Sequence, residues 1–217
     1  MIAVIDYGAG NIRSVENAFE RLGAGCFLTS DPDRILSADH IVLPGVGSFG
    51  DAMAKLNALS LVGPIREAVL EKHIPFLGIC LGLQLLFEGS DESEGVEGLS
   101  LLPGTIKRFD PSLAGKIPQI GWNDLVQPIY DVNNSAEDNG RGFRGRILNG
   151  VPSGSFFYFV HSYCLYDEGQ DFVAAACDYG SRFAAVVEKD RLYACQFHPE
   201  KSGDIGLRIL SNFIGEK

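Results

Sequence analysis

The sequence predicts an α/β fold built on a mostly parallel sheet, with an antiparallel extension in its C-terminal half. Three observations support this prediction. The chain opens with a short apolar strand, a glycine-rich turn, an amphipathic helix and a second apolar strand, which is the order of a βαβ unit. Near residue 80, an apolar strand turns directly into an apolar helix. Towards the C-terminus, short strands follow one another with only turn residues between them, as in an antiparallel meander.

The N-terminal part supplies the βαβ unit. Ile2–Ile5 is an apolar run, and the turn DYGAGN follows it. Strands are also expected at residues 26–29 and 39–43, the second closed by Pro44. Between the first two strands a helix that ends near Gly23 is expected, because apolar residues recur there at helical spacing: Ile12, Val15, Phe19 and Leu22.

The rest of the chain continues this alternation. Helices are expected at residues 52–59, 62–71 and about 204–214. Residues 89–98 are acidic and glycine-rich and predict a surface loop, whereas residues 130–146 lack any apolar period and predict an exposed, mobile loop. The remaining short apolar runs predict strands: residues 99–109, 116–122, 156–160, 172–176, 183–187 and 192–195.

The composition is that of an ordinary globular protein. The 217 residues are 46% hydrophobic and 21% charged, which suits a single domain spanning residues 1–217. The net charge of −10 argues against nucleic acid or an anionic membrane as a partner, because an acidic surface repels both. No apolar stretch approaches the length of a membrane span.

The cysteines indicate a reducing environment. All five are widely spaced and most lie inside apolar runs, so neither a disulfide framework nor a zinc site is expected. The first strand begins at Ile2 with no basic, apolar leader before it, so no signal peptide is expected. We therefore expect a cytoplasmic protein.

Cys80 is the first candidate catalytic residue. It lies between Gly78 and Gly82 where the strand becomes a helix, which is the layout of a nucleophile elbow with cysteine in place of serine. The glycines permit a tight turn that lifts the thiol towards a cleft. The helix N-terminus then favours the thiolate form. The alternative is that Cys80 is simply a small buried apolar residue.

His198 and Glu200 are the candidates for the groups that activate the thiol. The last strand runs into the segment QFHPE, where His198 can serve as the base that a thiol nucleophile needs. Glu200 can hold the far ring nitrogen of that histidine, and Pro199 stiffens the spacing between them. Of the four histidines, His161 is the main rival for the role of base. A histidine at a strand end can also have no chemical role.

The turn GVGSFG at residues 45–50 permits three interpretations. It matches the dinucleotide-binding pattern G-x-G-x-x-G after a strand, but this fingerprint is weak in isolation and normally occupies the first βα unit. Gly45 and Gly47 also allow backbone N–H groups to converge on a small anion. The third interpretation is a tight turn with no ligand.

Taken together, these segments resemble the class I (triad) glutamine amidotransferases. The segments that carry the resemblance are GICLGLQLLF at 78–87 and QFHPE at 196–200. Within that class, the chain resembles the glutaminase subunits of imidazole glycerol phosphate synthase through further motifs in the same order: IDYGAGNIRSV, LPGVGSFGDAM, PQIGWN, YFVHSY and QFHPEKSGDIGLRILSNF. Residues 130–146 depart from the family pattern by being longer and more polar.

The resemblance implies a flavodoxin-like sheet with helices on both faces, and a catalytic triad of Cys80, His198 and Glu200. The thiolate would attack the side-chain carboxamide of glutamine, and no metal or other cofactor is implied. The resemblance also implies which residues hold the oxyanion or the substrate: Gly45, Val46, Gly47, Leu81, Gln84, Ser162 and Tyr163.

The resemblance further implies a partner. Enzymes of this class pass ammonia to a synthase, which in this family is a separate (β/α)8-barrel cyclase subunit. Asn11, Trp122 and Lys201 match family positions near that partner. Two alternatives stay open at this point. One is a paralogous glutaminase that supplies another synthase, for example in surface-sugar biosynthesis, and the other is a catalytically silent binding subunit.

Overall fold

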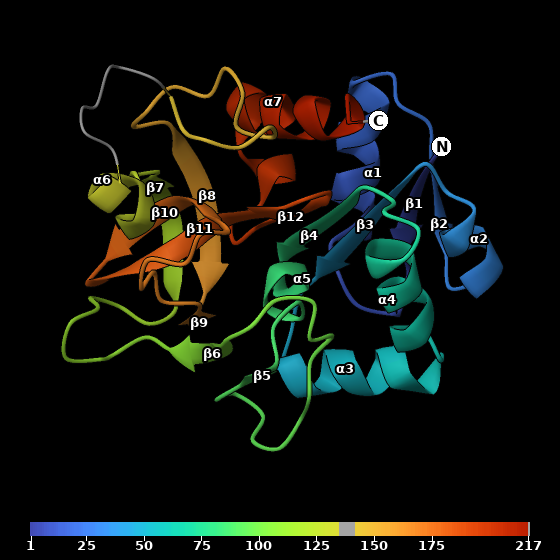
Figure 1. Cartoon of the computed structure of the whole chain (residues 1–217), viewed down its shortest axis with the longest axis horizontal. Coiled ribbons are helices and arrows are strands. Elements are labelled where there is room, and N and C mark those ends of the chain that lie inside the picture. The colour runs from blue at the N-terminus through green and yellow to red at the C-terminus, as the bar shows by residue number, and fades with distance from the viewer. Residues whose placement is uncertain (135–141, 217) are drawn as a thin grey trace.

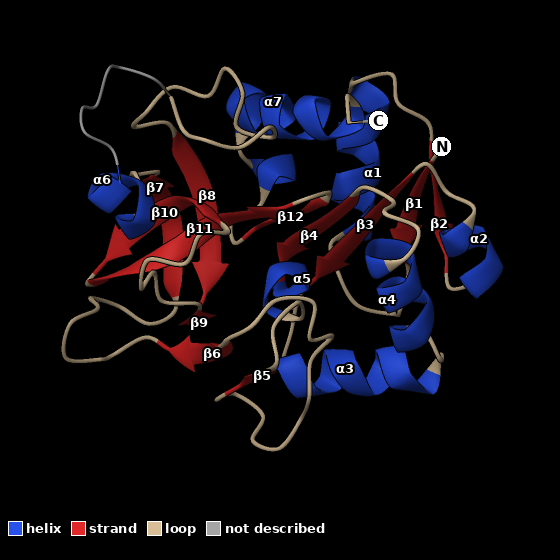
Figure 2. Cartoon of the chain, in the orientation of Figure 1, coloured by secondary structure: helices blue, strands red, loops and turns tan. Residues whose placement is uncertain are grey.

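The computed structural model describes residues 1–134 and 142–216, and its centre is a seven-stranded sheet of order β10-β11-β12-β4-β3-β1-β2 (Figures 1 and 2). Strands β1 to β4 and β12 pair in parallel, whereas β10 and β11 run antiparallel at one end. The predicted fold class is therefore confirmed. The strands are β1 (Ile2–Ile5), β2 (Cys26–Thr29), β3 (His40–Gly45), β4 (Phe76–Cys80), β10 (Val173–Tyr179), β11 (Ser181–Lys189) and β12 (Leu192–Cys195).

Helices cover both faces of this sheet (Figure 1). One face carries α1 (Ile12–Arg21) and α7 (Gly203–Ile214). The other carries α2 (Pro32–Leu36), α3 (Phe49–Ala58) and α4 (Val62–Leu70). Two short helical segments follow the strands that carry the candidate site, namely α5 (Leu81–Gln84) after β4 and the 3₁₀ turn η1 (Pro199–Lys201) after β12.

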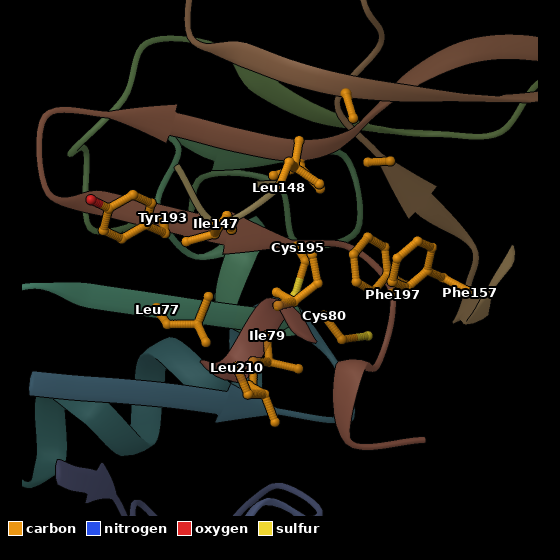
Figure 3. Close-up of a cluster of buried hydrophobic side chains, with 14 of the residues drawn as sticks. Leu77, Ile79, Cys80, Ile147, Leu148, Phe157, Tyr193, Cys195, Phe197 and Leu210 are labelled. Atoms are coloured by element: carbon orange, nitrogen blue, oxygen red, sulfur yellow. The ribbon is translucent and has the colours of Figure 1, made fainter. Parts of the chain in front are cut away.

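The alternation of side chains along each strand divides the core into two layers. In β1, Ile2 and Val4 pack in the layer of α1 and α7, whereas Ile5 packs in the layer of α3 and α4. Figure 3 shows part of the first layer, in which Ile79 of β4 and Leu210 of α7 are buried together. Each fully buried aliphatic or aromatic side chain contributes roughly 1.5–3 kcal/mol, so these layers hold the strand ends in fixed positions.

Two small sheets pack beside the main one. Strand β7 (Gln119–Asp124) pairs antiparallel with β8 (Phe156–His161), and β6 (Thr105–Arg108) joins β5 (Gly89–Ser90) to β9 (Tyr163–Cys164). Strand β8 is held against the segment that follows β12, because Phe157 stacks on Phe197 with ring centroids 4.1 Å apart. This contact brings residues 160–163 to the edge of the main sheet.

Several sequence expectations differ from the structure. The strand at 156–160 pairs with β7 in a separate ribbon and does not extend the main sheet. The expected strand at 99–109 is limited to β6, and the expected loop at 89–98 contains the short strand β5. Helix α2 was not expected, and its start is explained by Asp31, whose Oδ1 accepts a hydrogen bond from the N–H of Asp33.

The segment at 130–146 also differs from the expected loop where it is described. Helix α6 (Ile129–Asn134) occupies its beginning. At its end, Arg144 pairs with Asp131 at 2.9 Å and Arg146 pairs with Glu188 at 3.1 Å. Mobility was expected for the whole of residues 130–146 and stays a prediction, and residues 135–141 of this segment lie outside the described residues. Across residues 1–134 and 142–216, the helices are too short or too polar to span a membrane.

Candidate active site

The candidate site lies where three neighbouring parallel strands end. Strand β4 lies between β3 and β12, and parallel strands end at the same edge of a sheet. Gly45 of β3 is the register partner of Cys80, and Cys195 of β12 is the partner of Ile79. The turn after β3, the thiol at the end of β4 and the residues that follow β12 therefore meet in space.

The elbow at Cys80 has the strained backbone that the two glycines predict. Cys80 has φ 56° and ψ −106°, and a non-glycine residue in such a region costs of order 1–3 kcal/mol. A Cβ on Gly82 would lie 1.9 Å from the carbonyl oxygen of Leu43, and a Cβ on Gly78 would lie 2.7 Å from that of Gly82. Only glycine fits at these two positions, and the packing around them keeps Cys80 in its strained conformation.

The thiol itself is less exposed than an elbow suggests. The Cys80 side chain lines a cavity, yet the residue is only 5% exposed. Its Sγ lies 3.8 Å from the carbonyl oxygen of Val160 and 3.8 Å from Nε2 of Gln196. The thiol thus faces a cavity, as the sequence predicts, but β8 and the segment after β12 pack over the sulfur and leave it open only on that side.

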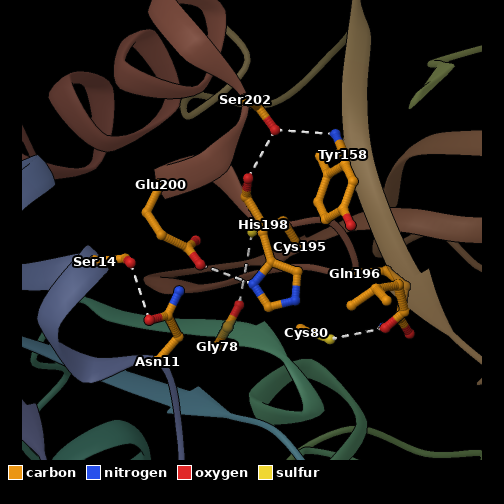
Figure 4. A network of polar contacts seen from close by, with 11 residues as sticks. Asn11, Ser14, Gly78, Cys80, Tyr158, Cys195, Gln196, His198, Glu200 and Ser202 are labelled. Atoms are coloured by element: carbon orange, nitrogen blue, oxygen red, sulfur yellow. Dashed lines mark hydrogen bonds and ion pairs between the residues drawn. The ribbon is translucent and has the colours of Figure 1, made fainter. Parts of the chain in front are cut away.

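His198 and Glu200 form the buried pair that the sequence predicts (Figure 4). Nδ1 of His198 lies 2.8 Å from Oε1 of Glu200, and the two side chains are 2% and 1% exposed. The backbone N–H of His198 donates to the carbonyl of Tyr158, and the hydroxyl of Ser202 donates to the carbonyl of His198 at 2.7 Å. These bonds fix η1 against β8 and hold the imidazole in place.

The surroundings of His198 favour its protonated form. Burial lowers its pKa, but hydrogen bonding to Cys80 and to Glu200 outweighs burial and raises the pKa to about 9. Within the described residues, Nε2 of His198 has no partner at ordinary hydrogen-bond geometry. At neutral pH, this ring can therefore stay protonated, and it can give up a proton through Nε2.

His161, the rival base, lies in a different environment. Its Nδ1 lies 2.9 Å from the carbonyl oxygen of Tyr163, and its ring packs against Phe109, Phe159 and Phe183. Burial lowers the pKa of His161 to about 4, so the ring is neutral at physiological pH. These contacts suit a histidine that orders the wall of the cavity better than one that takes the proton of Cys80.

The cavity beside Cys80 has a volume of about 260 Å³. This is slightly below the roughly 300–1,000 Å³ of pockets that hold drug-sized ligands, so it suits a small metabolite. It is lined by most of the residues that the sequence assigned to substrate or oxyanion, namely Val46, Gly47, Leu81, Gln84, Ser162 and Tyr163. Gly45 lies directly beside Cys80 in the sheet and outside this lining.

The turn after β3 needs glycine for two separate reasons. Gly47 has φ +102°, which disfavours other residues. At Gly45 a Cβ would lie 2.7 Å from the hydroxyl of Tyr7 and 2.9 Å from Cβ of Leu81, so the close packing of the turn on the elbow excludes a side chain. Leu81 begins α5, and the first N–H groups of a helix have no acceptor inside it.

Two residues decide which charge the cavity accepts. Nε2 of Gln84 donates to the carbonyl of Tyr163 at 3.0 Å and to Oε1 of Gln196 at 3.2 Å, so Gln84 can offer a ligand only its own carbonyl oxygen. Glu92 also lines the cavity. The sequence assigned Glu92 to an acidic surface loop and missed it, since its position depends on how that loop folds back over α3. Together, an amide oxygen and a carboxylate suit an ammonium group.

The same loop argues against dinucleotide binding at residues 45–50. Oε2 of Glu92 accepts from the N–H of Phe49 at 2.7 Å, and the hydroxyl of Ser93 accepts from the N–H of Gly50 at 3.0 Å. The N-terminus of α3, which would hold the phosphates of a dinucleotide, is therefore occupied by side chains of the protein. Among the described residues, no group of three His, Cys, Asp or Glu side chains is arranged to hold a metal ion.

Two of the three residues predicted near a partner lie together outside the cavity. Trp122 of β7 is 55% exposed and meets the ring of Tyr158 edge-on, with centroids 6.1 Å apart. Nζ of Lys201 lies 5.9 Å from the same ring. Asn11 precedes α1, and its Oδ1 accepts from the hydroxyl of Ser14 at 2.9 Å.

Comparison with known proteins finds relatives that match almost the whole chain. The family model of glutamine amidotransferase class-I matches residues 3–216. The chain is 47% identical over 216 residues to the imidazole glycerol phosphate synthase subunit HisH of Methanothermobacter thermautotrophicus, covering 99% of this chain and 98% of that one. It is 45% identical over 212 residues to the HisH subunit of Moorella thermoacetica, covering 98% and 93%.

Solved structures support the same fold at lower identity. A crystal structure of a glutamine amidotransferase aligns with a TM-score of 0.72 and 17% identity, covering 100% of both chains. A structure of PurLQS from Thermotoga maritima aligns with a TM-score of 0.65 and 21% identity, covering 99% of this chain and 97% of that one.

Proposed function

This chain belongs to the glutamine amidotransferase class-I family, and we propose that it hydrolyses glutamine at Cys80 as the glutaminase subunit of an imidazole glycerol phosphate synthase in histidine biosynthesis. The observation that carries the proposed chemistry is the arrangement of Cys80, His198 and Glu200. The carboxylate lies 2.8 Å from the imidazole, and hydrogen bonding to the Cys80 sulfur contributes to the raised pKa of that imidazole. A nucleophile, a base and an orienting acid in this order form a catalytic triad.

The reaction follows from these positions. The Cys80 thiolate forms a bond to the carboxamide carbon of glutamine, and the carbonyl π electrons move to the oxygen. The N–H of Leu81 is one donor to this oxyanion, and the Gly45–Val46–Gly47 turn supplies the other. His198 protonates the departing nitrogen, the C–N bond breaks, and ammonia leaves. A glutamyl thioester remains on Cys80. Water that is deprotonated by His198 then releases glutamate and regenerates the thiolate.

The cavity walls give the substrate its orientation. The α-ammonium group of glutamine carries a positive charge that suits the amide oxygen of Gln84 and the carboxylate of Glu92, both of which line the cavity. Ser162 and Tyr163 also line the cavity. Their carbonyl oxygens already accept from Phe109 N–H and from Gln84, so these bonds hold the wall in position while other backbone groups face the substrate.

The partner in this proposal is a separate cyclase subunit with a (β/α)8 barrel, which receives the ammonia. The chain acts as one domain within a cytoplasmic heterodimer. Support comes from the exposed apolar face of the β7–β8 ribbon, where Ile120, Trp122 and Phe156 are each more than half exposed. Trp122 and Lys201 both lie close to the ring of Tyr158 in this region, and Asn11 is the third residue that we assign to the interface.

Two measurements test the proposal. The chain is co-purified with candidate cyclases, and glutamine hydrolysis is assayed for each complex. We expect the barrel cyclase of histidine biosynthesis to bind and to raise the rate. Selective association with a different synthase would instead identify a paralogous glutaminase. In the second measurement, an electrophilic glutamine analogue should label Cys80 before the other four cysteines, and equal labelling of all five would contradict the role of Cys80.

A further inference from the structure

Gln196 lies at the centre of the site but was not among the residues that the sequence assigned to it. It follows β12 directly and is 0% exposed. Its side chain lies between two groups of the site. Oε1 accepts a hydrogen bond from Nε2 of Gln84 at 3.2 Å, and Nε2 lies 3.8 Å from Sγ of Cys80. A buried carboxamide beside a nucleophile needs a reason, because burying such a group without partners is costly.

The hydrogen bonds determine which end of the Gln196 amide faces the sulfur. The carbonyl oxygen of Tyr163 can only accept, so Gln84 must direct its Nε2 towards it, at 3.0 Å. The same Nε2 can only donate, so Gln196 must direct Oε1 towards Gln84. The remaining end of Gln196, its NH₂ group, then faces Cys80. The carbonyl of Tyr163 therefore fixes the orientation of both amides, and the Gln196 NH₂ group can donate a hydrogen bond to Sγ of Cys80.

We propose that Gln196 is a further catalytic residue, which donates an amide N–H to the sulfur of Cys80 and stabilises its thiolate form. The proposal rests on the role of Cys80 given above. A thiolate accepts hydrogen bonds and donates none, whereas the thiol directs its own proton to an acceptor, here the carbonyl oxygen of Val160 at 3.8 Å. That proton passes to Nε2 of His198, which has no other partner at ordinary geometry among the described residues. The proton and the negative charge are thus separated between His198 and the sulfur.

The donor acts at two steps of the reaction. Before attack it raises the fraction of Cys80 that is thiolate. After acylation the sulfur is neutral, and the hydrogen bond is weaker. When water attacks the thioester, the C–S bond breaks and the sulfur leaves as a thiolate, so the N–H of Gln196 strengthens its interaction as that charge develops.

The test measures the reactivity of Cys80 without glutamine. The full-length protein is treated with iodoacetamide at pH 7 and at pH 10, and alkylation of the Cys80 peptide is followed by mass spectrometry. Two variants are compared with the wild type: Gln196→Leu, which removes the donor, and Gln196→Glu, which keeps the shape and replaces the donor by a carboxylate. The control is Gln119→Leu, which removes another buried carboxamide that is 3% exposed and lies outside the network.

We expect Gln196→Leu to slow alkylation at pH 7 by about tenfold. This value is at the lower end of the effect of a hydrogen bond to a charged group, because an N–H···S contact is long. Gln196→Glu should slow it further. Gln196→Leu should approach the wild-type rate at pH 10, where a cysteine thiol ionises without help. Gln196→Glu should lose less at pH 10 than at pH 7, and Gln119→Leu should match the wild type at both pH values. If Gln196→Leu does not fold, Gln196→Glu supplies the same comparison.

Two results would overturn the proposal: wild-type alkylation at pH 7 in the Gln196 variants, or an equal loss at pH 7 and pH 10, which indicates lost access to the sulfur. A failure of the proposed glutaminase function is seen separately, because it leaves the alkylation difference in place while the wild type shows no glutamine hydrolysis with its partner.

Discussion

The carboxylate of Glu200 lies 2.8 Å from Nδ1 of His198 at a place where both side chains are almost completely buried. Such a pair stays charged only if its partners compensate for the loss of water. Here the compensation extends to Cys80, since hydrogen bonding to the thiol contributes to raising the pKa of His198. The three groups therefore act as one electrostatic unit, and substitutions in it should not have independent effects.

Unequal effects are expected for the two acid–base residues. His198→Asn removes the group that moves protons, and we expect kcat for glutamine hydrolysis to fall about 10²- to 10⁴-fold. Glu200→Gln keeps an oxygen that can accept from Nδ1 and loses only the charge, so its effect should be smaller. Steady-state kinetics of both variants with the partner present check this order. The reverse order would contradict the assigned roles and return His161 as a candidate base.

The raised pKa of His198 predicts a pH-dependent stability. The pKa rises from 6.5 to about 9 in the folded state, so folding is favoured by protonated His198. This contribution is complete below pH 6.5, decreases as pH rises towards 9, and is absent above it. Its upper limit is about 3 kcal/mol.

Chemical denaturation at pH 6 and pH 9.5 measures this contribution, with His198→Asn as the reference that cancels the titrating groups outside the triad. The wild type should lose more stability than the variant over this range. Cys80→Ala should reduce the difference, because the thiol helps to raise the pKa of the imidazole. A difference that does not change with pH would argue against a charged His198.

Loss of the nucleophile should abolish activity and spare the fold. Cys80→Ser or Cys80→Ala removes the thiolate, so glutamine-dependent turnover should disappear. The residue is buried, but it lines a cavity, and its sulfur is a small part of the core. The free energy of unfolding should therefore change by only about 1 kcal/mol. Circular dichroism and a glutaminase assay measure the two effects, and turnover in either variant would exclude Cys80 as the nucleophile.

Sequence patterns predicted the elements of the main sheet well, for a physical reason. Buried parallel strands appear as short apolar runs, and the glycines on either side of Cys80 are required by contacts that exclude any Cβ. The two-residue spacing of His198 and Glu200 was sufficient to predict their contact, because both lie in one short rigid segment. Local constraints of this kind are visible in the sequence.

The sequence was less successful in predicting which segments far apart along the chain lie together in the fold. Strand β8 was expected in the C-terminal antiparallel meander. Its actual pairing with β7 depends on which other strand has an unpaired edge beside it in the fold. Gln196 and Glu92 were missed because their roles depend on neighbours far along the chain: Gln84 and Cys80 for the first, and the N-terminus of α3 for the second. An alternating pattern gives the face of a strand but not its partner.

The elbow should not tolerate a methyl group at Gly82. A Cβ there would lie 1.9 Å from the carbonyl oxygen of Leu43, so Gly82→Ala must push β3 and α5 apart. We expect a loss of stability of about 3 kcal/mol or more, in the range seen when packing forces the backbone to shift. Gly63→Ala in α4 is the matched control, since its Cβ meets nothing within 4 Å. Thermal unfolding of the two variants compares them directly, and equal melting temperatures would contradict the predicted clash.

The final prediction concerns activation by the partner. The isolated chain should hydrolyse glutamine slowly, and a cyclase subunit with its ligand bound should raise the rate. The reason lies in the turn after β3, where glycines flank Val46 and leave its peptide groups easy to rotate. The second oxyanion donor need not point into the cavity at rest, and a single missing donor costs about 10²- to 10³-fold in rate. A partner that binds more tightly when this N–H points into the cavity shifts the turn towards that conformation.

Gly47→Val tests this mechanism, because φ +102° at this position is unfavourable for a β-branched residue. The variant should lose stimulation by the partner while still binding glutamine, whereas Gly63→Val, on an exposed position of α4, should be stimulated normally. The glutaminase rate is measured with and without the cyclase and its ligand, and glutamine affinity is measured by calorimetry. A lone chain that is fully active and unaffected by its partner would show that the turn is a fixed oxyanion site.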